Sequence, residues 1–398
     1  MSGAVPELRF PEFTGPIKPV KLSEVATFSK GKGVSKSDID PNGPLPCIRY
    51  GELYTVYGTV IDEPVSRTPV PAKDLILSMG GEVLVPASGE TAKDIATAAV
   101  VKRPGVAIGG DLNIIRSDHD GAYLASYLSG RKRLALAAMA QGNSVVHLYA
   151  AQLGSLDVHL PELQEERKVS KFLSNVDAKL TALREKADGL RQFKTGLMQR
   201  LFSQELRFTQ DDGSDFPDWE EKPFSTIATR VGEQFDPRKE NGKPRVIELE
   251  HLESGSGKIL SSGDIDGQIS LKNRFRSGDV LFGKLRPYLR KFARPDFDGV
   301  CSSEIWVLRG RKGVSNGFLY ALVQSSLFGQ MANISSGSKM PRADWKTIAG
   351  VDFPVPCSEE QEKIASALSA LDTKIDAVTD QITHMETFKK GLLQKMFV

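Results

Sequence analysis

The sequence predicts an α+β protein in which two similar globular parts are each followed by one long helix. FKTGLMQRLF ends at Phe202, and the nearly identical FKKGLLQKMF ends at Phe397, 195 positions later. Each stretch closes a segment with helical periodicity, and each such segment follows short apolar runs separated by Gly and Pro. A shift of this length is too long for a solenoid repeat and indicates two copies of a domain-sized unit.

The repeat keeps its register over the helical segments. Residues 160–180 align with residues 355–375 without a gap, and the upstream match of 141–161 with 336–356 is weaker. Near the start of each copy, PELRF (6–10) resembles QELRF (204–208). We therefore expect globular parts at 1–155 and 204–352, and helical regions at 156–203 and 353–398.

Both helical segments carry an apolar residue at alternating steps of four and three, which is the a/d pattern of a coiled coil. A helix of about 40 residues would be about 60 Å long. The obvious partner for each apolar seam is the other seam, although the alternative, two ordinary amphipathic core helices, stays open. The pattern alone does not choose between parallel and antiparallel pairing. The predicted seam residues are Val169, Leu173, Val176, Leu180, Leu183, Ala187 and Leu190 in the first copy, and Ile364, Leu368, Leu371, Ile375, Val378, Ile382 and Met385 in the second.

The globular parts mix strand-like and helical stretches. Helical spacing marks 123–140 and 318–332. The matched edges of the two parts are alike, but the regions between them differ strongly, as expected of two domains that recognise different targets. The runs that look like strands are 46–60, 74–79 and 82–87 in the first copy, and 278–285 and 302–310 in the second.

Composition limits the classes of protein that fit. With 398 residues, 40% hydrophobic and 26% charged, the chain has the make-up of a soluble globular protein of two or three domains. A net charge of +2 means that any basic surface is local. Three distant cysteines, Cys47, Cys301 and Cys357, indicate neither a disulfide framework nor a zinc ribbon, and favour a reducing cytoplasm. We expect no signal peptide and no membrane span.

No convincing catalytic or metal-binding set appears. There is no GxxxxGK[ST] phosphate loop and no Asn/Asp-Pro-Pro-aromatic methyltransferase motif, and the five histidines lack metal-ligand spacing. A nuclease pattern can be drawn through Pro217, Asp218, Glu220 and Lys222, but these residues are crowded into one segment that we interpret as a solvated linker. Binding is therefore favoured over catalysis, and we predict no catalytic residue and no metal site.

Clusters of cations with interleaved aromatic residues are the candidates for nucleic-acid binding. The strongest is 282–295 in the second copy, and 29–38 with 49–58 is the weaker counterpart in the first. The alternative for each cluster is an ordinary solvated surface or strand edge. Loops just before each helical segment add further polar residues. The predicted DNA-binding residues are Lys30, Lys32, Lys36, Tyr54, Arg131 and Asn143 in the first copy, and Lys284, Arg286, Tyr288, Arg290, Lys291, Lys339 and Arg342 in the second.

Taken together, the chain resembles the specificity subunit of a type I restriction-modification system. The paired segments LPELQEERKVSKFLSNVDAKL and VPCSEEQEKIASALSALDTKI, each continued to the FK-G-L-Q-F ending, carry the resemblance, supported by IRYGELYTVYG and FGKLRPYLRKFA. It covers essentially the whole chain. The resemblance implies two target recognition domains that each bind one half of an asymmetric double-stranded DNA site. They would be joined by an intramolecular antiparallel coiled coil with pseudo-two-fold symmetry.

The resemblance also implies partners. The helical segments would set the spacing between half-sites and dock two adenine-methyltransferase subunits, which two endonuclease/translocase subunits join. S-adenosylmethionine, ATP and Mg would be bound by those partners, so we expect no cofactor and no catalysis in this chain. Two other functions stay open on the residues alone: a scaffold that binds only proteins, and a nuclease that uses Asp218 and Glu220.

Overall fold

The computed structural model describes residues 3–142, 145–334 and 340–398. The chain forms two compact units, one of Met1–Arg184 with Asp380–Val398 and the other of Glu185–Thr379. The boundaries between the units lie within two long helices, one in α7 (Leu163–Phe202) and the other in α12 (Ser358–Lys395). Each unit therefore contains a globular part together with a portion of both helices.

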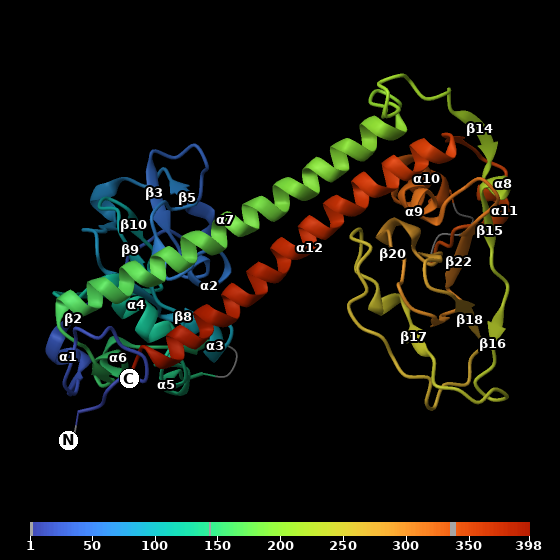
Figure 1. The fold of residues 1–398 in the computed structure, drawn as a ribbon. Helices are drawn as coiled ribbons and strands as arrows, with labels where there is room; N and C mark the ends of the chain where they lie inside the picture. The colour runs from blue at the N-terminus through green and yellow to red at the C-terminus, as the bar shows by residue number, and fades with distance from the viewer. Residues whose placement is uncertain (1–2, 143–144, 335–339) are drawn as a thin grey trace. The chain divides into compact units, whose positions relative to one another are not determined.

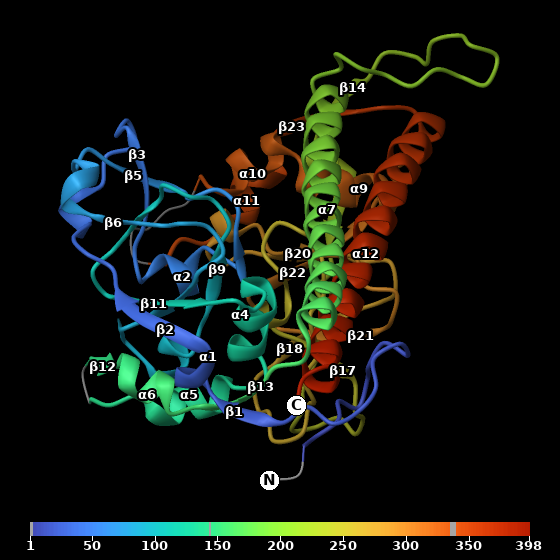
Figure 2. The same cartoon turned by 90° about the vertical axis from the view of Figure 1, so that its left-hand side faces the viewer.

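The first unit is built on a five-stranded sheet and a four-stranded sheet (Figures 1 and 2). The five-stranded sheet has the order β2-β11-β7-β9-β4, antiparallel except for the β4–β9 pair, and α4 packs against β7 and β9. The four-stranded sheet has the order β5-β3-β10-β6. The strands are β1 (Pro19–Lys21), β2 (Ala26–Lys30), β3 (Leu45–Ile48), β4 (Val60–Ile61), β5 (Ser66–Thr68), β6 (Ile76–Leu77), β7 (Val83–Pro86), β8 (Ser88–Gly89), β9 (Ala99–Val101), β10 (Ala107–Ile108), β11 (Leu112–Ser117), β12 (Val146–His147) and β13 (Asp157–His159). The short helices are α1 (Leu22–Val25), η1 (Lys36–Asp38), α2 (Glu52–Thr55), η2 (Ala72–Asp74), α3 (Ala92–Ile95), α4 (Gly121–Ser129), α5 (Arg133–Met139) and α6 (Ala150–Gly154).

The second unit repeats the same plan with two four-stranded sheets, β15-β22-β19-β20 and β16-β18-β21-β17. A two-stranded pair, β14 with β23, precedes the long helix, as β1 with β13 does in the first unit. The strands are β14 (Glu220–Pro223), β15 (Ala228–Arg230), β16 (Gln234–Phe235), β17 (Arg245–Ile247), β18 (Lys272–Phe275), β19 (Val280–Gly283), β20 (Phe292–Ala293), β21 (Gly299–Cys301), β22 (Ile305–Gly310) and β23 (Asp352–Val355). The short helices are α8 (Phe224–Ile227), η3 (Leu249–His251), η4 (Pro287–Leu289), α9 (Asn316–Gln324), α10 (Ser326–Ala332) and α11 (Trp345–Ala349).

The α+β class and the two long helices are confirmed, and the helices pack together in antiparallel directions (Figure 1). Within the first unit, Asp177 bonds Lys389 and Arg184 bonds Glu386, so residue numbers fall on α12 as they rise on α7. Within the second unit, Arg191 contacts Thr379 and Lys194 bonds Asp372 in the same sense. The direction that the heptad pattern left open is therefore antiparallel.

Most of the predicted seam is buried, but its ends serve the globular parts. Val169, Leu173 and Val176 belong to the first unit's core, which also holds the α12 residue Leu392. Ile364 and Leu368 belong to the corresponding core of the second unit. The later part of the α12 seam is less enclosed, since Ile375, Ile382 and Met385 are only half-buried, as is Leu190 at the end of the α7 seam. The other seam residues, Leu180, Leu183, Ala187, Leu371 and Val378, are buried. The start of each helix is thus both a domain core helix and part of a helix pair.

Three predicted elements, at 46–60, 123–140 and 318–332, differ locally from the structure. Residues 46–60 are not one strand, because the backbone turns at Gly51, in the αR region, and forms α2 before β4. There Arg49 and the buried Glu52 bond each other through side chain and main chain. Each predicted helical stretch is also two helices. Gly130 ends α4, while the Ser325 hydroxyl caps α10 by accepting from Phe328 N.

Candidate nucleic-acid interface and helix junctions

The strongest cationic segment forms a strained turn between β19 and β20. Arg286 and Arg290 both adopt φ of +51°, in the left-handed region that non-glycine residues rarely occupy, and they flank the one-turn helix η4. Between them, Tyr288 is 55% exposed and Arg286 is exposed beside it. Strain of this kind costs of order 1–3 kcal/mol per residue and is characteristic of functional loops. The turn therefore exposes the Tyr288 ring and the side chains of Arg286 and Arg290.

Backbone hydrogen bonds hold this turn against the loop before α11. Arg286 N donates to Pro341 O at 2.8 Å, and Ala343 N donates to Lys284 O at 2.8 Å. Arg342 follows Pro341 and pairs with Glu304 at 3.0 Å. The structure thus brings the segment 284–291 together with Arg342, while Lys339 lies outside the described residues.

Besides Arg342, two predicted DNA-binding cations in the turn itself already have partners inside the unit. The Arg290 guanidinium donates through Nη2 to Gln324 O at 2.7 Å, and Lys291 Nζ donates to Leu249 O at 2.6 Å. Lys284 is half-buried. Among the described residues of this turn, Arg286 and Tyr288 are therefore the side chains best placed to meet an external ligand. A DNA role stays a prediction for these two residues and for all the others.

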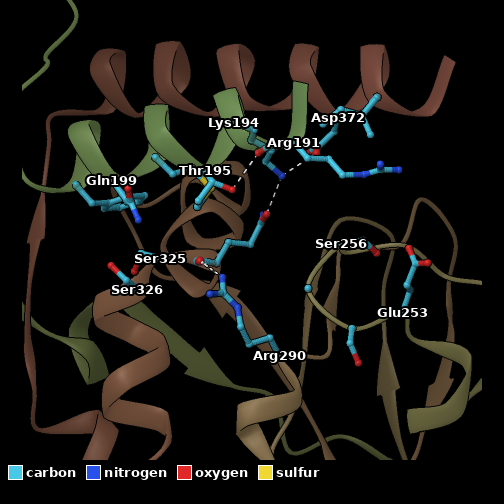
Figure 3. Close-up of a pocket in the computed structure, with 16 residues that line it drawn as sticks. Arg191, Lys194, Thr195, Gln199, Glu253, Ser256, Arg290, Ser325, Ser326 and Asp372 are labelled. Carbon is cyan, nitrogen blue, oxygen red and sulfur yellow. Dashed lines mark hydrogen bonds and ion pairs between the residues drawn. The ribbon is translucent and has the colours of Figure 1, made fainter. Parts of the chain in front are cut away.

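Behind the turn lies a cavity of about 600 Å³ (Figure 3). In it, Lys194 Nζ from α7 donates to Gln324 Oε1 at 2.8 Å and to Asp372 Oδ1 of α12 at 2.7 Å. Burial raises the pKa of Asp372, and the Lys194 ammonium opposes that shift. Arg290, at the end of the η4 turn, lines the same cavity. The cavity is the point where the turn, α9 and both long helices of this unit meet.

In the first unit, two predicted segments converge on one hollow of about 850 Å³. It is lined by Lys36 with other residues of 33–38, and by Arg49 and Tyr50 with other residues of 49–55. The Tyr50 and Tyr54 rings contact each other with centroids 6.4 Å apart. Burial raises the pKa of Tyr54, so its phenol stays protonated at neutral pH.

The remaining predicted residues of the first unit lie elsewhere. Lys30 ends β2 opposite Asn113, and Lys32 N donates to Ile108 O, with both side chains exposed. Arg131 is exposed in the turn between α4 and α5. Burial lowers the pKa of the His159 imidazole, and the nearby charges of Lys132 and Arg131 lower it further. Asn143 lies outside the described residues.

The junctions between each globular part and its helices are the most strongly duplicated feature. Buried Glu165 near the start of α7 receives a two-pronged hydrogen bond from Arg9, and buried Glu360 near the start of α12 receives one from Arg207. These charge-assisted forks are the strongest class of side-chain bond. The other repeated ion pairs are Lys168–Glu12 with Lys363–Asp211, and Asp177–Lys389 with Asp372–Lys194.

Aromatic packing repeats in the same way. Phe397, at the end of the chain, packs on Tyr123 with ring centroids 5.0 Å apart. Phe202, at the end of α7, packs on Phe318 at 6.0 Å. Tyr123 lies in α4 and Phe318 in the equivalent α9. The two FK-G-L-Q-F endings therefore have one structural task, which is to attach the end of each long helix to a globular part.

Sequence reasoning missed several of these residues as parts of a site. Arg9 and Arg207 were visible only as part of the repeated ELRF. Their partners lie 156 and 153 positions away, respectively, and no local pattern indicates them. Arg49 and Tyr50 were noticed within a cationic segment but not assigned to the hollow. Their neighbourhood depends on the chain turning at Gly51.

The carboxylates of the alternative nuclease segment have partners in the structure. Asp218 lies 3.6 Å from Arg207, and Glu220 bonds Lys222 at 2.8 Å. Within residues 3–142, 145–334 and 340–398, no group of three or more His, Cys, Asp or Glu side chains could hold a metal ion. Over the same residues, no helix is long and apolar enough to cross a membrane.

Comparison with known proteins identifies the family. The family model "Type I restriction modification DNA specificity domain" matches residues 15–189 and 234–386, which together are most of the chain. The chain belongs to this family. The two matched regions each cover most of one globular part and most of one long helix.

Curated relatives and solved structures agree with this membership. The chain is 22% identical over 293 residues to the type I restriction enzyme EcoDI specificity subunit of Escherichia coli, and 22% identical over 280 residues to the MjaVIII specificity subunit of Methanocaldococcus jannaschii. Each alignment covers 65% of this chain and 65% of the relative's length. The S subunit of a type I restriction-modification system from M. genitalium has the same fold, with a TM-score of 0.63 and 15% identity over 100% of this chain and 99% of the other. A chain from a study of complex assembly in a type I R-M system gives a TM-score of 0.55 and 17% identity over 97% and 99%.

Proposed function

We propose that this chain is the DNA specificity subunit of a type I restriction-modification complex. Its globular parts, 1–155 and 204–352, are two target recognition domains that each bind one half of an asymmetric bipartite site in double-stranded DNA. The observation that carries the proposal is the duplicated set of helix junctions in a chain of this family. The junctions are alike, whereas the surfaces that the two domains present differ.

The unlike surfaces support an asymmetric target. The second domain offers Arg286 and Tyr288 on a strained turn, and the first offers Lys36, Arg49 and Tyr50 around a hollow. Cations supply phosphate contacts, and an Arg fork reads guanine in the major groove. Since the two side-chain sets differ in spacing and in the backbone that carries them, the two half-sites should have different sequences.

The helical regions 156–203 and 353–398 act as the spacer and as the docking site for partners. DNA has an approximate dyad, so two similar domains can meet successive major-groove faces about 34 Å apart. Two adenine-methyltransferase subunits bind the helical regions, and two endonuclease/translocase subunits join through them. The partners hold S-adenosylmethionine, ATP and Mg, and this chain works in the cytoplasm by recognition without catalysis.

Methylation mapping of the reconstituted complex tests the proposal. The purified chain, its cognate methyltransferase subunit and S-adenosylmethionine are incubated with a library of DNA sequences, and methylated adenines are located by sequencing. We expect two different short half-sites separated by a fixed number of base pairs. Methylation at one half-site only, or at sites unchanged when this chain is omitted, would contradict the proposal. A chain that assembles with the methyltransferase but confers no DNA binding would instead be a protein scaffold.

A further inference from the structure

Each unit sets a buried carboxylate opposite an arginine of the neighbouring strand. In the second unit Arg309 donates through Nε and Nη2 to the two carboxylate oxygens of Asp279, each at 2.7 Å. In the first unit the equivalent residues are Glu82 and Arg116, which face each other one step beyond the last pair of the β7–β11 register. Both carboxylates also accept a hydrogen bond from the backbone N–H three residues earlier. The two pairs therefore occupy the same position of the repeated fold.

The pair of the first unit is open. Arg116 Nη2 lies 3.6 Å from Glu82 Oε1, which is outside hydrogen-bond distance. Glu82 is 3% exposed, and its Oε2 has no hydrogen-bond partner among the described residues. Arg116 Nε is also buried and has no partner among them. A buried acceptor and a buried donor are thus unused on two opposite charges, although the same fold closes the pair in its second copy.

One residue of β2 accounts for the open pair. Ser29 Oγ accepts a hydrogen bond from Arg116 Nη1 at 3.0 Å and holds the guanidinium toward β2. The pairing of β2 with β11, and of β15 with β22, places Val231 where the first unit has Ser29. Valine has no hydroxyl group that could accept this bond. The open pair is therefore specific to the first unit and is not required by the scaffold that the two units share.

The open pair borders a hollow of about 370 Å³. Glu82 and Arg116 line it together with Leu163 and Arg167 from the start of α7. Met79 and Leu163 give it apolar walls, and the exposed Arg167 adds a second cation. The space is about ten times the volume of one water molecule and lies at the small end of the range for ligand pockets, about 300–1,000 Å³. It therefore admits a small organic molecule beside the pair.

The chemistry of the pair indicates the kind of ligand. Its unused atoms belong to a carboxylate and a guanidinium, with which an ammonium and a carboxylate would form charge-assisted hydrogen bonds, the stronger class. Since the two protein groups lie 3.6 Å apart, the two charges of the ligand must be close together, as they are on the single carbon of an α-amino acid. The charged side chains around the hollow are nearly balanced, which suits a zwitterion: Glu82, Asp118 and Asp120 against Arg116 and Arg167.

We propose that this hollow binds a free α-amino acid with an apolar side chain. Glu82 Oε2 accepts from the ammonium, and Arg116 Nε donates to the carboxylate, near which Arg167 adds positive charge. The apolar side chain packs on Met79 and Leu163. An occupied site would join the start of α7 to the edge of the β7–β11 pair. Among the described residues, no predicted DNA-binding side chain lines this hollow, so the inference goes beyond the proposed function.

Isothermal titration calorimetry of the full chain with L-leucine tests the inference. We expect one saturable site for each chain. The analogue 4-methylpentanoate lacks the ammonium, and 3-methylbutylamine lacks the carboxylate. Each should bind at least about 10-fold more weakly than L-leucine, because each leaves one charged group of the pair without a partner. An analogue that binds as tightly as L-leucine would contradict the assigned contacts.

Variants separate binding from folding. The double change Ser29→Val with Glu82→Asp copies the closed pair of the second unit. It should unfold at the same temperature or higher, because two buried polar atoms gain partners, and it should lose binding of L-leucine. Glu82→Gln keeps the size of the side chain and should weaken binding at least about 10-fold. Arg103→Ala is the matched control, since Arg103 is an exposed cation of the same unit that pairs with exposed Glu63, and binding should be unchanged.

Two results would overturn the inference. One is the lack of a saturable site for L-leucine on the unchanged chain, or equal binding to the unchanged chain and to the double variant. The other is a crystal structure grown with L-leucine in which only ordered water joins Glu82 to Arg116, because the pair would then be completed by solvent. Neither result affects the methylation mapping, so the inference and the proposed function can fail separately.

Discussion

At the scale of single residues, buried ion pairs fasten each globular part to its helix. Glu360 is fully buried and accepts hydrogen bonds from Arg207 and from Trp219 Nε1 at 2.9 Å. Removing one partner of such a pair leaves the other charge uncompensated, which is more costly than losing an exposed pair. The contribution of these residues to stability is therefore concentrated at the junctions.

Glu360→Gln should destabilise the second unit by about 3 kcal/mol, the lower end for a broken buried pair, because Arg207 keeps some exposure to water. All three tryptophans, Trp219, Trp306 and Trp345, lie in this unit, so tryptophan fluorescence during urea unfolding follows it selectively. Lys363→Ala is the matched control, since its partner Asp211 is exposed, and it should cost less than about 1 kcal/mol. Equal effects of the two changes would show that the buried fork has no special role.

The first unit has a titratable group where the second has a neutral one. Glu166 is buried and accepts from Asp120 N at 2.9 Å beside His119, whereas the equivalent Gln361 accepts from Ser315 N at 3.0 Å. Burial raises the pKa of Glu166 above its ordinary value of 4.5, with the hydrogen bond from Asp120 N and the nearby His119 opposing the shift. A carboxyl group with a raised pKa in the folded state stabilises the fold below pH 4.5, and that contribution is lost as pH rises through the raised pKa.

Glu166→Gln should therefore remove part of the pH dependence of the first unit's stability. Hydrogen exchange of amides at the start of α7, measured from about pH 4 to 7, reports local opening there. We expect protection that falls with rising pH in the unchanged chain and a flatter profile in the variant, after correction for the intrinsic exchange rate. The start of α12 serves as the internal control, and an unchanged profile at α7 would contradict the assignment.

At the scale of elements, the sequence predicted best what is periodic and repeated. The 40-residue α7 and the 38-residue α12 follow from the alternating four-three pattern, and their partnership follows from the match between them. Short strands were predicted less well, because two-residue pairings such as β4 and β10 depend on neighbours far along the chain. The heptad pattern could not predict that the helices run antiparallel. That direction shows in ion pairs between residues about 200 positions apart, such as Arg184 with Glu386.

The candidate site was only partly predictable for the same reason. Composition located the cationic segment 282–295, but not that Arg290 and Lys291 would donate hydrogen bonds to backbone carbonyl oxygens of their own unit. The directions of these side chains depend on the left-handed backbone of Arg286 and Arg290, which flank η4. Arginine rarely adopts that conformation, so the sequence gives no sign of it. Which cation faces solvent therefore depended on backbone geometry that the local pattern does not contain.

Leu180→Asp tests the helix pair as an element. Leu180 is 4% exposed and lies between Asp177 and Arg184, whose α12 partners are Lys389 and Glu386. Burying a carboxylate there should separate the two helices locally, at a cost of several kcal/mol. Hydrogen exchange should rise at 176–184 and at 385–390 together, whereas the exposed Ala182→Asp should leave both protected. Faster exchange on α7 alone would show that the helices do not stabilise each other at this level.

At the scale of the whole molecule, near-neutral charge suggests that affinity for DNA is shared with the partners. A net charge of +2 over 398 residues means that cations and anions are nearly balanced, so the chain as a whole attracts DNA only weakly. Binding by the isolated chain should then be weaker than binding by the assembled complex at equal salt. Equal affinities would count against a shared DNA interface.

Arg286→Ala in the assembled complex tests whether the η4 turn contacts DNA. Each phosphate contact contributes about 0.9 to the slope of log affinity against log salt concentration, so its loss should lower the slope by about that amount if Arg286 meets a phosphate. If Arg286 reads a base instead, the slope should stay and discrimination at one half-site should fall by about 1–3 kcal/mol. Fluorescence anisotropy at several salt concentrations, with DNA altered in one half-site at a time, separates these cases. Lys346→Ala, an exposed cation of α11 in the same unit, is the control. Unchanged slope and unchanged discrimination at both half-sites would remove the turn from the DNA interface, while the helix junctions would keep their support.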